Sequence, residues 1–143
     1  MKEYHKLSHC VYYANYHIVF VTKYRRKIFK YGMGAYACQT LKKVQRNYIG
    51  TEILECNSDK DHIHILIRIP PKYPISEVVG FMKGYSAHAI RKRFNFLNKV
   101  YFGSDGIWSS GYFMSTVGID EDTIRNYIEY QGKEDNGQAK LEL

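Results

Sequence analysis

Long hydrophobic runs are absent from this sequence of 143 residues. No apolar segment approaches the roughly 18 residues that a membrane-spanning helix needs, so we expect no membrane among its partners. The first ten residues, MKEYHKLSHC, also lack the apolar core of a secretory signal. The sequence therefore predicts a single domain over residues 1–143 that works inside the cell.

Cysteine is scarce as well. The three residues Cys10, Cys38 and Cys56 lie far apart, are odd in number and form no CxxC pair. This spacing argues against a disulfide framework and against a zinc ribbon. We therefore expect no disulfide framework, and a reducing compartment.

The charges are mostly positive and unevenly spread. The formal net charge is +7, and half of the 14 acidic residues fall in residues 120–143, so residues 1–119 are strongly basic. A basic body attracts polyanions such as nucleic acids. The 14 tyrosines add aromatic rings on which unpaired bases stack. These features favour a nucleic-acid partner, although a basic protein with a tyrosine-rich core is the simpler alternative.

The spacing of apolar residues predicts seven elements in the order β-α-β-β-α-β-α. The expected strands cover residues 10–22, 51–56, 62–69 and 111–118, and the expected helices cover residues 33–48, 76–94 and 120–131. Ser76 should cap the second helix, and Asp120 or Asp122 should cap the third. The first six elements follow the split βαβ pattern of ferredoxin-like folds. We therefore expect an α+β protein with a four-stranded antiparallel sheet, two helices on one face, and an added C-terminal helix.

The segment DHIHILIRI places two histidines on one face of a strand, because alternate side chains of a strand share a face. His62 and His64 lie on one face, while the other face carries the core residues Ile63, Ile65, Ile67 and Ile69. Two imidazoles about 7 Å apart along a strand can bind one divalent cation. The alternative is a pair of histidines that serve only at the surface or in packing.

One face of the last expected helix offers a further candidate metal ligand and a candidate nucleophile. Ile124, Tyr127, Ile128 and Gln131 follow the i, i+3, i+4, i+7 pattern and share one face. A polar Gln131 on that face needs a partner, and its amide oxygen offers a third metal ligand. Tyr127 would then lie beside the metal, whereas Tyr130 is about 100° away around the helix. A tyrosine hydroxyl can attack a DNA phosphodiester, and a metal ion stabilises the charge that develops.

At these residues the sequence resembles the TnpA transposases of the insertion-sequence 200/605 group, which are single-tyrosine members of the HUH endonuclease superfamily. The resemblance rests on YHIVFVTKYRRKIF, SDKDHIHILI, a PP pair followed by a helix with MKGYSA, WSSGYFMSTVG and YIEYQ. These segments occur in the family's order and cover nearly the whole chain.

The resemblance implies that Tyr127 is the nucleophile and that His62, His64 and Gln131 hold Mg²⁺ or Mn²⁺. It implies a ferredoxin-like body over residues 1–119, followed by a tyrosine helix and tail over residues 120–143. It further implies a homodimer that cleaves and rejoins single-stranded DNA at hairpins through a 5′-phosphotyrosine, in the cytoplasm and associated with the nucleoid. In the family, the tyrosine helix of one subunit can complete the site of the other.

Several residues near these motifs have two interpretations. His17 is expected to be structural rather than a ligand, and Asp61 to orient a ligand histidine. Trp108 either stacks on bases or packs in the core. Phosphate contacts are expected from two basic groups: Lys23, Arg25, Arg26 and Lys27, and Arg91 and Arg93. The alternatives are a solvated turn for the first group and relief of a helix dipole for the second.

Two rival functions remain open. A non-catalytic, RRM-like module that binds single strands fits the basic charge and the aromatic residues, but it gives no reason for the histidine pair. A metal-dependent phosphodiesterase that uses water would need no tyrosine. A covalent protein–DNA adduct separates the three, because only the transposase forms one.

Overall fold

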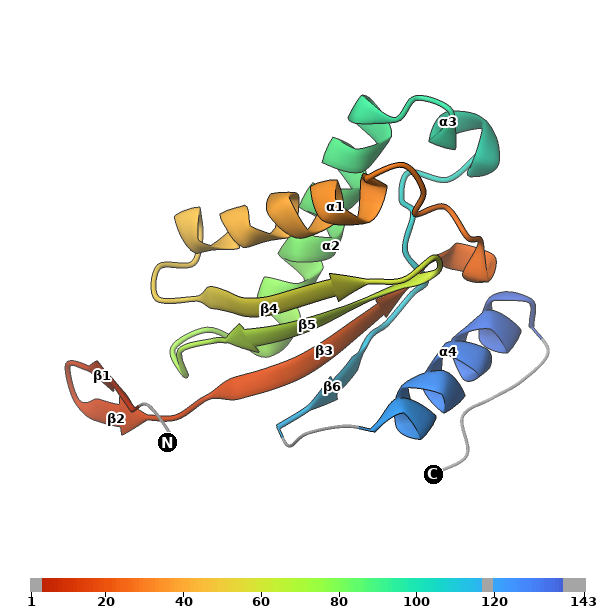
Figure 1. The fold of residues 1–143 in the computed structure, drawn as a ribbon. Coiled ribbons are helices and arrows are strands. Elements are labelled where there is room, and N and C mark those ends of the chain that lie inside the picture. Colours follow the sequence, from red (N-terminus) through yellow and green to blue (C-terminus); the bar gives the residue numbers. More distant parts are fainter. Residues whose placement is uncertain (1–3, 117–119, 138–143) are drawn as a thin grey trace.

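The computed structural model describes residues 4–116 and 120–137. Its main feature is a four-stranded antiparallel sheet in the order β4-β5-β3-β6 (Figure 1). The strands are β3 (Asn15–Val21), β4 (Glu52–Ser58), β5 (His62–Arg68) and β6 (Phe113–Ser115). The predicted α+β class and antiparallel sheet are confirmed.

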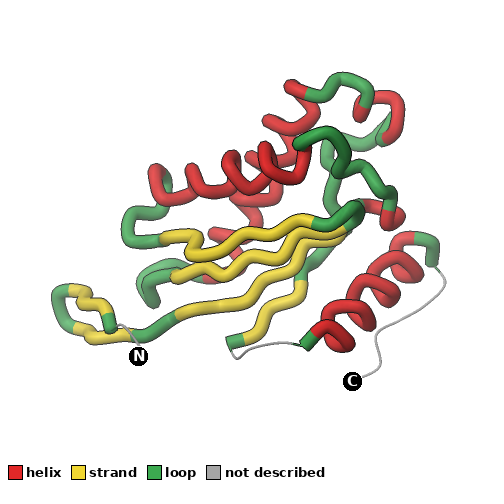
Figure 2. Tube along the Cα trace, viewed as in Figure 1, coloured by secondary structure: helices red, strands yellow, loops and turns green. Residues whose placement is uncertain are grey.

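The helices lie on both faces of this sheet. Figure 2 shows α1 (Met33–Leu41) and α2 (Ile75–Arg93) on one side and α4 (Glu121–Asp135) on the other. The described chain also contains three short helical segments: η1 (Lys23–Arg25), η2 (Lys42–Arg46) and α3 (Leu97–Val100). None of these three was expected as a separate element.

The main core lies between the sheet and the helix pair. The predicted alternation along β5 is present: Ile63, Ile65 and Ile67 are fully buried, whereas the residues between them are half-buried. Trp108 belongs to the same core, where its indole N–H donates to Ser86 Oγ at 3.0 Å. The core-packing interpretation of Trp108 is therefore the one that the structure supports.

The strand expected over residues 10–22 is broken in two. Residues Cys10–Tyr12 form β2, which pairs with β1 (His5–Leu7) as a separate hairpin, and β3 begins only at Asn15. Both pieces are rich in residues that favour strands, so composition gives no sign of the change of partner. The final strand is also shorter than expected, and residues 117 and 118 of the expected range lie outside the described residues.

The expected cap at Asp120 is confirmed, whereas three other helix ends differ from the expected ones. Ser76 lies inside the first turn of α2, because Pro74 takes the cap position without a side-chain hydrogen bond. Asp120 is the cap of α4, and its carboxylate accepts a hydrogen bond from the Thr123 amide at 2.7 Å. Helix α4 continues to Asp135, four residues beyond the expected end. The helix expected over residues 33–48 changes to the 3₁₀ segment η2 after Leu41.

One disulfide bond is present, although the cysteine spacing argued against a disulfide framework. Cys38 of α1 and Cys56 of β4 form a disulfide bond, while Cys10 is free and exposed. The two are 18 residues apart in the sequence, but α1 packs across β4 and brings them together.

Within the described ranges, no helix is long and apolar enough to cross a membrane.

Candidate active site

The two predicted ligand histidines lie on the face of the sheet that α4 covers. The register of β3 and β5 pairs Val19 with His64 and Val21 with His62, and residues paired in this way point to the same face. Ile128 of α4 packs against Val19 and Val21. The histidine pair and the predicted tyrosine helix therefore share one side of the sheet.

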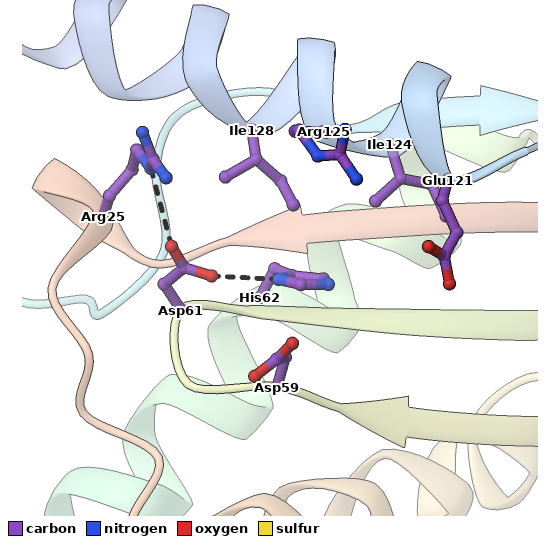
Figure 3. A pocket seen from close by; sticks show the side chains of 8 residues that line it. All are labelled: Arg25, Asp59, Asp61, His62, Glu121, Ile124, Arg125 and Ile128. Carbon is purple, nitrogen blue, oxygen red and sulfur yellow. Dashed lines mark hydrogen bonds and ion pairs between the residues drawn. The ribbon is translucent and has the colours of Figure 1, made fainter.

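A carboxylate fixes the orientation of His62. Asp61 Oδ1 lies 2.9 Å from His62 Nδ1, and Asp61 Oδ2 lies 3.5 Å from Arg25 Nε (Figure 3). The hydrogen bond with His62 lowers the pKa of Asp61, and the Arg25 guanidinium lowers it further, although burial acts against them. Because Nδ1 is engaged with Asp61, the Nε2 lone pair of His62 is the one available to a metal ion. The contact predicted for Asp61 is present.

His64 contacts the third histidine on this face. His64 Nε2 lies 3.1 Å from His17 Nδ1. Burial lowers the pKa of His64, and the neighbouring His17 and His62 rings lower it further. His64 is thus held neutral, which is the form of imidazole that binds a metal ion. A cation would take the other ring nitrogen of His64 or replace His17 as the partner of Nε2.

The predicted stripe of α4 faces the protein. The Tyr127 hydroxyl donates to Gln131 Oε1 at 3.1 Å, and the Gln131 side chain is only 3% exposed. The Tyr127 ring packs against Phe113 of β6, with 5.6 Å between ring centroids. Burial raises the pKa of Tyr127 well above its ordinary value, and Tyr130 and Asp135 add to this effect. The hydroxyl therefore keeps its proton at neutral pH and needs help to become a nucleophile.

One row of paired residues connects Tyr127 with a histidine. Val19 pairs with His64 on one side and with Phe113 on the other. Because neighbouring strands lie about 4.8 Å apart, the backbone of Phe113 is about 10 Å from that of His64. Tyr127 packs on Phe113, so it lies beside the third residue of the cross-strand series His64–Val19–Phe113.

A cavity of about 320 Å³ separates His62 from α4. Figure 3 shows Asp59, Asp61 and His62 facing Glu121 and Ile124 of α4 across this space. Tyr127 and Gln131 lie further along the same helix, outside the lining of the cavity. The structure thus brings His62 close to the first half of α4 and places Tyr127 against the neighbouring β6.

The donors on this face fit a divalent cation. Two imidazoles are available, but among the described residues no three His, Cys, Asp or Glu side chains form a cluster that could hold a metal ion. The third ligand predicted from the sequence, the amide oxygen of Gln131, accepts the hydrogen bond of Tyr127 in this structure, and its place in a metal site stays a prediction. Three neutral ligands would leave the cation its full charge, which suits an anionic substrate.

The basic residues that were expected to bind DNA have unequal surroundings. Lys27 and Arg93 are exposed, and the Arg93 guanidinium lies 5.2 Å from the Tyr36 ring centroid. Arg91 is half-buried and donates to the side chain of Asn98 at 3.0 Å and to the carbonyl of Ser104. DNA contact by any of these residues stays a prediction.

The other basic group follows β3 in and beside η1, where the backbone is unusual. Tyr24 and Arg25 have φ values of 61° and 53°, in the left-handed region. Arg25 binds Asp61 and also lies against Gly132 of α4, where any larger residue would collide with its side chain. Arg26 donates to the Val100 carbonyl, while Lys23 and Lys27 are half-exposed and exposed.

Three polar residues that are linked by hydrogen bonds beside the C-terminal end of α4 were not singled out from the sequence: Asp135, Ser109 and Lys83. Ser109 Oγ donates to Asp135 Oδ2 at 2.5 Å. The Lys83 ammonium donates to the carbonyls of Ser109 and Gly111 at 2.6 and 2.7 Å. Of the three, only Asp135 could have been predicted from the sequence, because it lies four residues after Gln131 and therefore on the same face of the helix, one turn further on.

The sheet and the shared face of histidines and tyrosine define a small α+β protein with a candidate metal-dependent active site. Residues 10–131 match the family of IS200-like transposases, and the chain belongs to this family. It is therefore a transposase enzyme, as the resemblance predicted.

Relatives with known names support this assignment. The chain is 35% identical over 137 residues to the transposase of insertion sequence element IS200 from Salmonella typhimurium, with 96% of this chain and 89% of the relative covered. It is 30% identical over 127 residues to the ISDra2 transposase TnpA of Deinococcus radiodurans, with 85% and 86% covered.

Solved structures share the fold. A crystal structure from Deinococcus radiodurans, assigned as a transposase, has a TM-score of 0.76 and 26% identity, and covers 89% of this chain and 97% of its own. A REP-associated tyrosine transposase bound to a REP hairpin has a TM-score of 0.54 and 17% identity, and covers 97% of this chain and 76% of its own.

Proposed function

We propose that this transposase cleaves and rejoins single-stranded DNA at hairpin-bearing element ends, with Tyr127 as the nucleophile. His62, His64 and Gln131 would hold Mg²⁺ or Mn²⁺. The observation that supports the proposal is the position of α4 on the face of the sheet that carries His62 and His64. On this helix the Tyr127 hydroxyl donates a hydrogen bond to Gln131. The nucleophile and the third ligand are thereby coupled by one hydrogen bond.

The bound cation would polarise the scissile phosphate and offset the charge of the transition state. The residues of the chain supply the rest. Asp61 holds His62 in the tautomer that exposes Nε2, and His64 is kept neutral by burial. Gln131 directs the Tyr127 hydroxyl, whose proton must leave as its oxygen attacks because burial disfavours a free phenolate.

The chemistry balances without an external energy source. Tyr127 Oη forms a bond to phosphorus, the bond from phosphorus to the 3′ oxygen breaks, and that oxygen takes a proton. The 5′ phosphate stays on the tyrosine, so a later 3′ hydroxyl can reverse the exchange and join new ends. This reversibility is what strand transfer without ATP requires.

Single-stranded hairpins are the proposed substrate for two reasons. The body of the protein is basic and rich in tyrosine, and a solved structure of the same fold is described as bound to a REP hairpin. We further propose that the enzyme acts as a homodimer, in the cytoplasm and associated with the nucleoid. Phosphate contacts are proposed for the exposed Lys27 and Arg93 in particular.

The test is the covalent adduct. Wild-type protein, Tyr127→Phe and Tyr130→Phe are each incubated with Mn²⁺ and an end-labelled hairpin strand from the element ends, and label retained on protein is measured in a denaturing gel. Tyr127→Phe should abolish cleavage and adduct together while leaving hairpin binding intact. Tyr130→Phe is the matched control and should stay active, because the Tyr130 hydroxyl has no bond to Gln131.

The rivals make different predictions in the same assay. Cleavage without any adduct, unaffected by Tyr127→Phe, would support the phosphodiesterase that uses water. Hairpin binding with neither cleavage nor adduct would support the RRM-like binding module. An adduct that persists in Tyr127→Phe but is lost in Tyr130→Phe would show that the other tyrosine is the nucleophile.

A further inference from the structure

Asp135 is the last residue of α4, and its carboxylate accepts three hydrogen bonds from three parts of the chain. The donors are Gln131 Nε2 at 3.3 Å, the backbone N–H of Tyr24 at 2.8 Å and Ser109 Oγ at 2.5 Å. A carboxylate in the last turn of a helix faces the negative end of the helix dipole, which is unfavourable. The three donors offset this cost, and their convergence indicates a specific role for the acid.

The carboxylate determines which way the Gln131 amide points. An ionised carboxylate has no proton and can only accept hydrogen bonds. Its contact with Gln131 must therefore be made by the NH₂ group, which turns the amide oxygen to the opposite side, toward the Tyr127 hydroxyl. If the amide were reversed, its NH₂ group would replace the oxygen, and an NH₂ group cannot bind a cation.

We propose that Asp135 is a positioning residue that holds the Gln131 amide with its oxygen toward Tyr127 and the histidine face. The inference rests on the proposed roles of Tyr127 and Gln131. All three residues belong to α4, so the hydrogen-bonded series Tyr127–Gln131–Asp135 is retained whichever subunit's sheet the helix covers.

The other two donors hold the carboxylate in place. Tyr24 belongs to η1, and Ser109 follows the bridge between Thr22 and Trp108. Lys83 fixes the same segment through the carbonyls of Ser109 and Gly111. The Asp135 carboxylate thus meets a rigid part of the body on one side and the buried Gln131 amide on the other.

The first test measures binding of Mn²⁺ alone to the full chain by titration calorimetry. Asp135→Asn keeps the size of the side chain but permits either orientation of Gln131, and should weaken Mn²⁺ binding roughly 10- to 100-fold. Asp135→Glu keeps two accepting oxygens and should bind more tightly than Asp135→Asn. Glu134→Gln removes the charge of the neighbouring exposed carboxylate and should retain the wild-type affinity.

The order of these variants decides between orientation and packing. If Asp135 acts only by filling space, Asp135→Asn will bind Mn²⁺ as the wild type does and Asp135→Glu will be the weaker variant, which would overturn the proposal. If Glu134→Gln is as weak as Asp135→Asn, loss of negative charge at this end of α4 rather than amide orientation is responsible, and the proposal is again overturned.

A second measurement needs no metal. The side-chain NH₂ protons of Gln131 in metal-free wild-type protein should exchange with solvent much more slowly than those of the exposed Gln45, and Asp135→Asn should remove that protection. Equal exchange of the two side chains in the wild type would refute the inference even if Tyr127 forms the adduct. Conversely, slow exchange without any adduct would support the orientation and reject the proposed function.

Discussion

At the residue scale, the hydroxyl of Tyr101 illustrates how a single buried group ties a loop to the body. It donates to the Lys23 carbonyl at 3.0 Å, and the side chain is 3% exposed. Burial raises the pKa of Tyr101 to about 12 from an ordinary value of 10.0, and the Arg26 guanidinium acts in the opposite direction. The fold therefore favours the protonated form.

This shift gives a prediction for alkaline pH. Because the folded-state pKa is raised, the stabilisation by Tyr101 is complete below pH 10.0 and is lost as the pH rises toward about 12. Tyr101→Phe should cost about 1 kcal/mol near neutral pH through the lost hydrogen bond. Urea unfolding across this pH range should show the difference between wild type and variant shrinking; a constant difference would contradict it.

The residues of the candidate site were easier to predict from the sequence than the residues that contact them. The alternation in β5 was sufficient to place His62 and His64 away from the core, and the helical stripe was sufficient to turn Tyr127 and Gln131 inward. Contacts between segments that are distant in the chain produce no such pattern in the sequence. Nothing in the sequence shows that Ser109 and Tyr24 meet the same carboxylate, because that depends on how loops pack.

At the scale of elements, α4 is held to the sheet by a small apolar cluster. Ile128 is 6% exposed and packs with Val19 and Val21, apart from the main core. Ile128→Ala should cost about 2–4 kcal/mol of local stability, because the truncated side chain leaves a cavity in this cluster. Amide exchange should rise throughout α4 while β3 and β5 stay protected. Equal loss of protection in the sheet would show that α4 and the body unfold as one unit.

The elements also show where prediction from sequence ends. The start of β5 at His62 and of α4 after Asp120 were predictable because apolar periodicity and a capping carboxylate mark them locally. The break before β3 was not, since Cys10–Tyr12 and Asn15–Val21 have the same strand-forming character and differ only in their partners. Which strands pair with each other depends on the folded chain, and local strand propensity does not predict it.

At the scale of the whole molecule, the disulfide between Cys38 and Cys56 joins the helix layer to an edge strand. Reduction should lower the free energy of unfolding by about 3 kcal/mol, as expected for a closed loop of this length. Urea unfolding with and without a reductant tests this. Cys10→Ser should respond as the wild type does, whereas Cys38→Ser should be insensitive to reductant. A wild type that ignores the reductant would contradict the prediction.

The arrangement of subunits in the proposed homodimer can be tested by mixing two inactive variants. The structure docks α4 on the sheet of its own chain. Heterodimers of His62→Ala and Tyr127→Phe should therefore stay inactive, because each site would contain one defect. If the helices are exchanged between subunits, one of the two sites would be intact, and recovery of adduct formation would reveal it.

The close fit of Gly132 against Arg25 has a consequence for how sequences of this family diverge. A β-carbon at position 132 would occupy the space of the Arg25 side chain, which in turn binds Asp61 beside His62. The two positions are 107 residues apart in the chain, yet a side chain at position 132 leaves no room for the present Arg25 side chain. Among relatives, a side chain at position 132 should accompany a shorter residue at position 25, so the two columns of a family alignment should vary together.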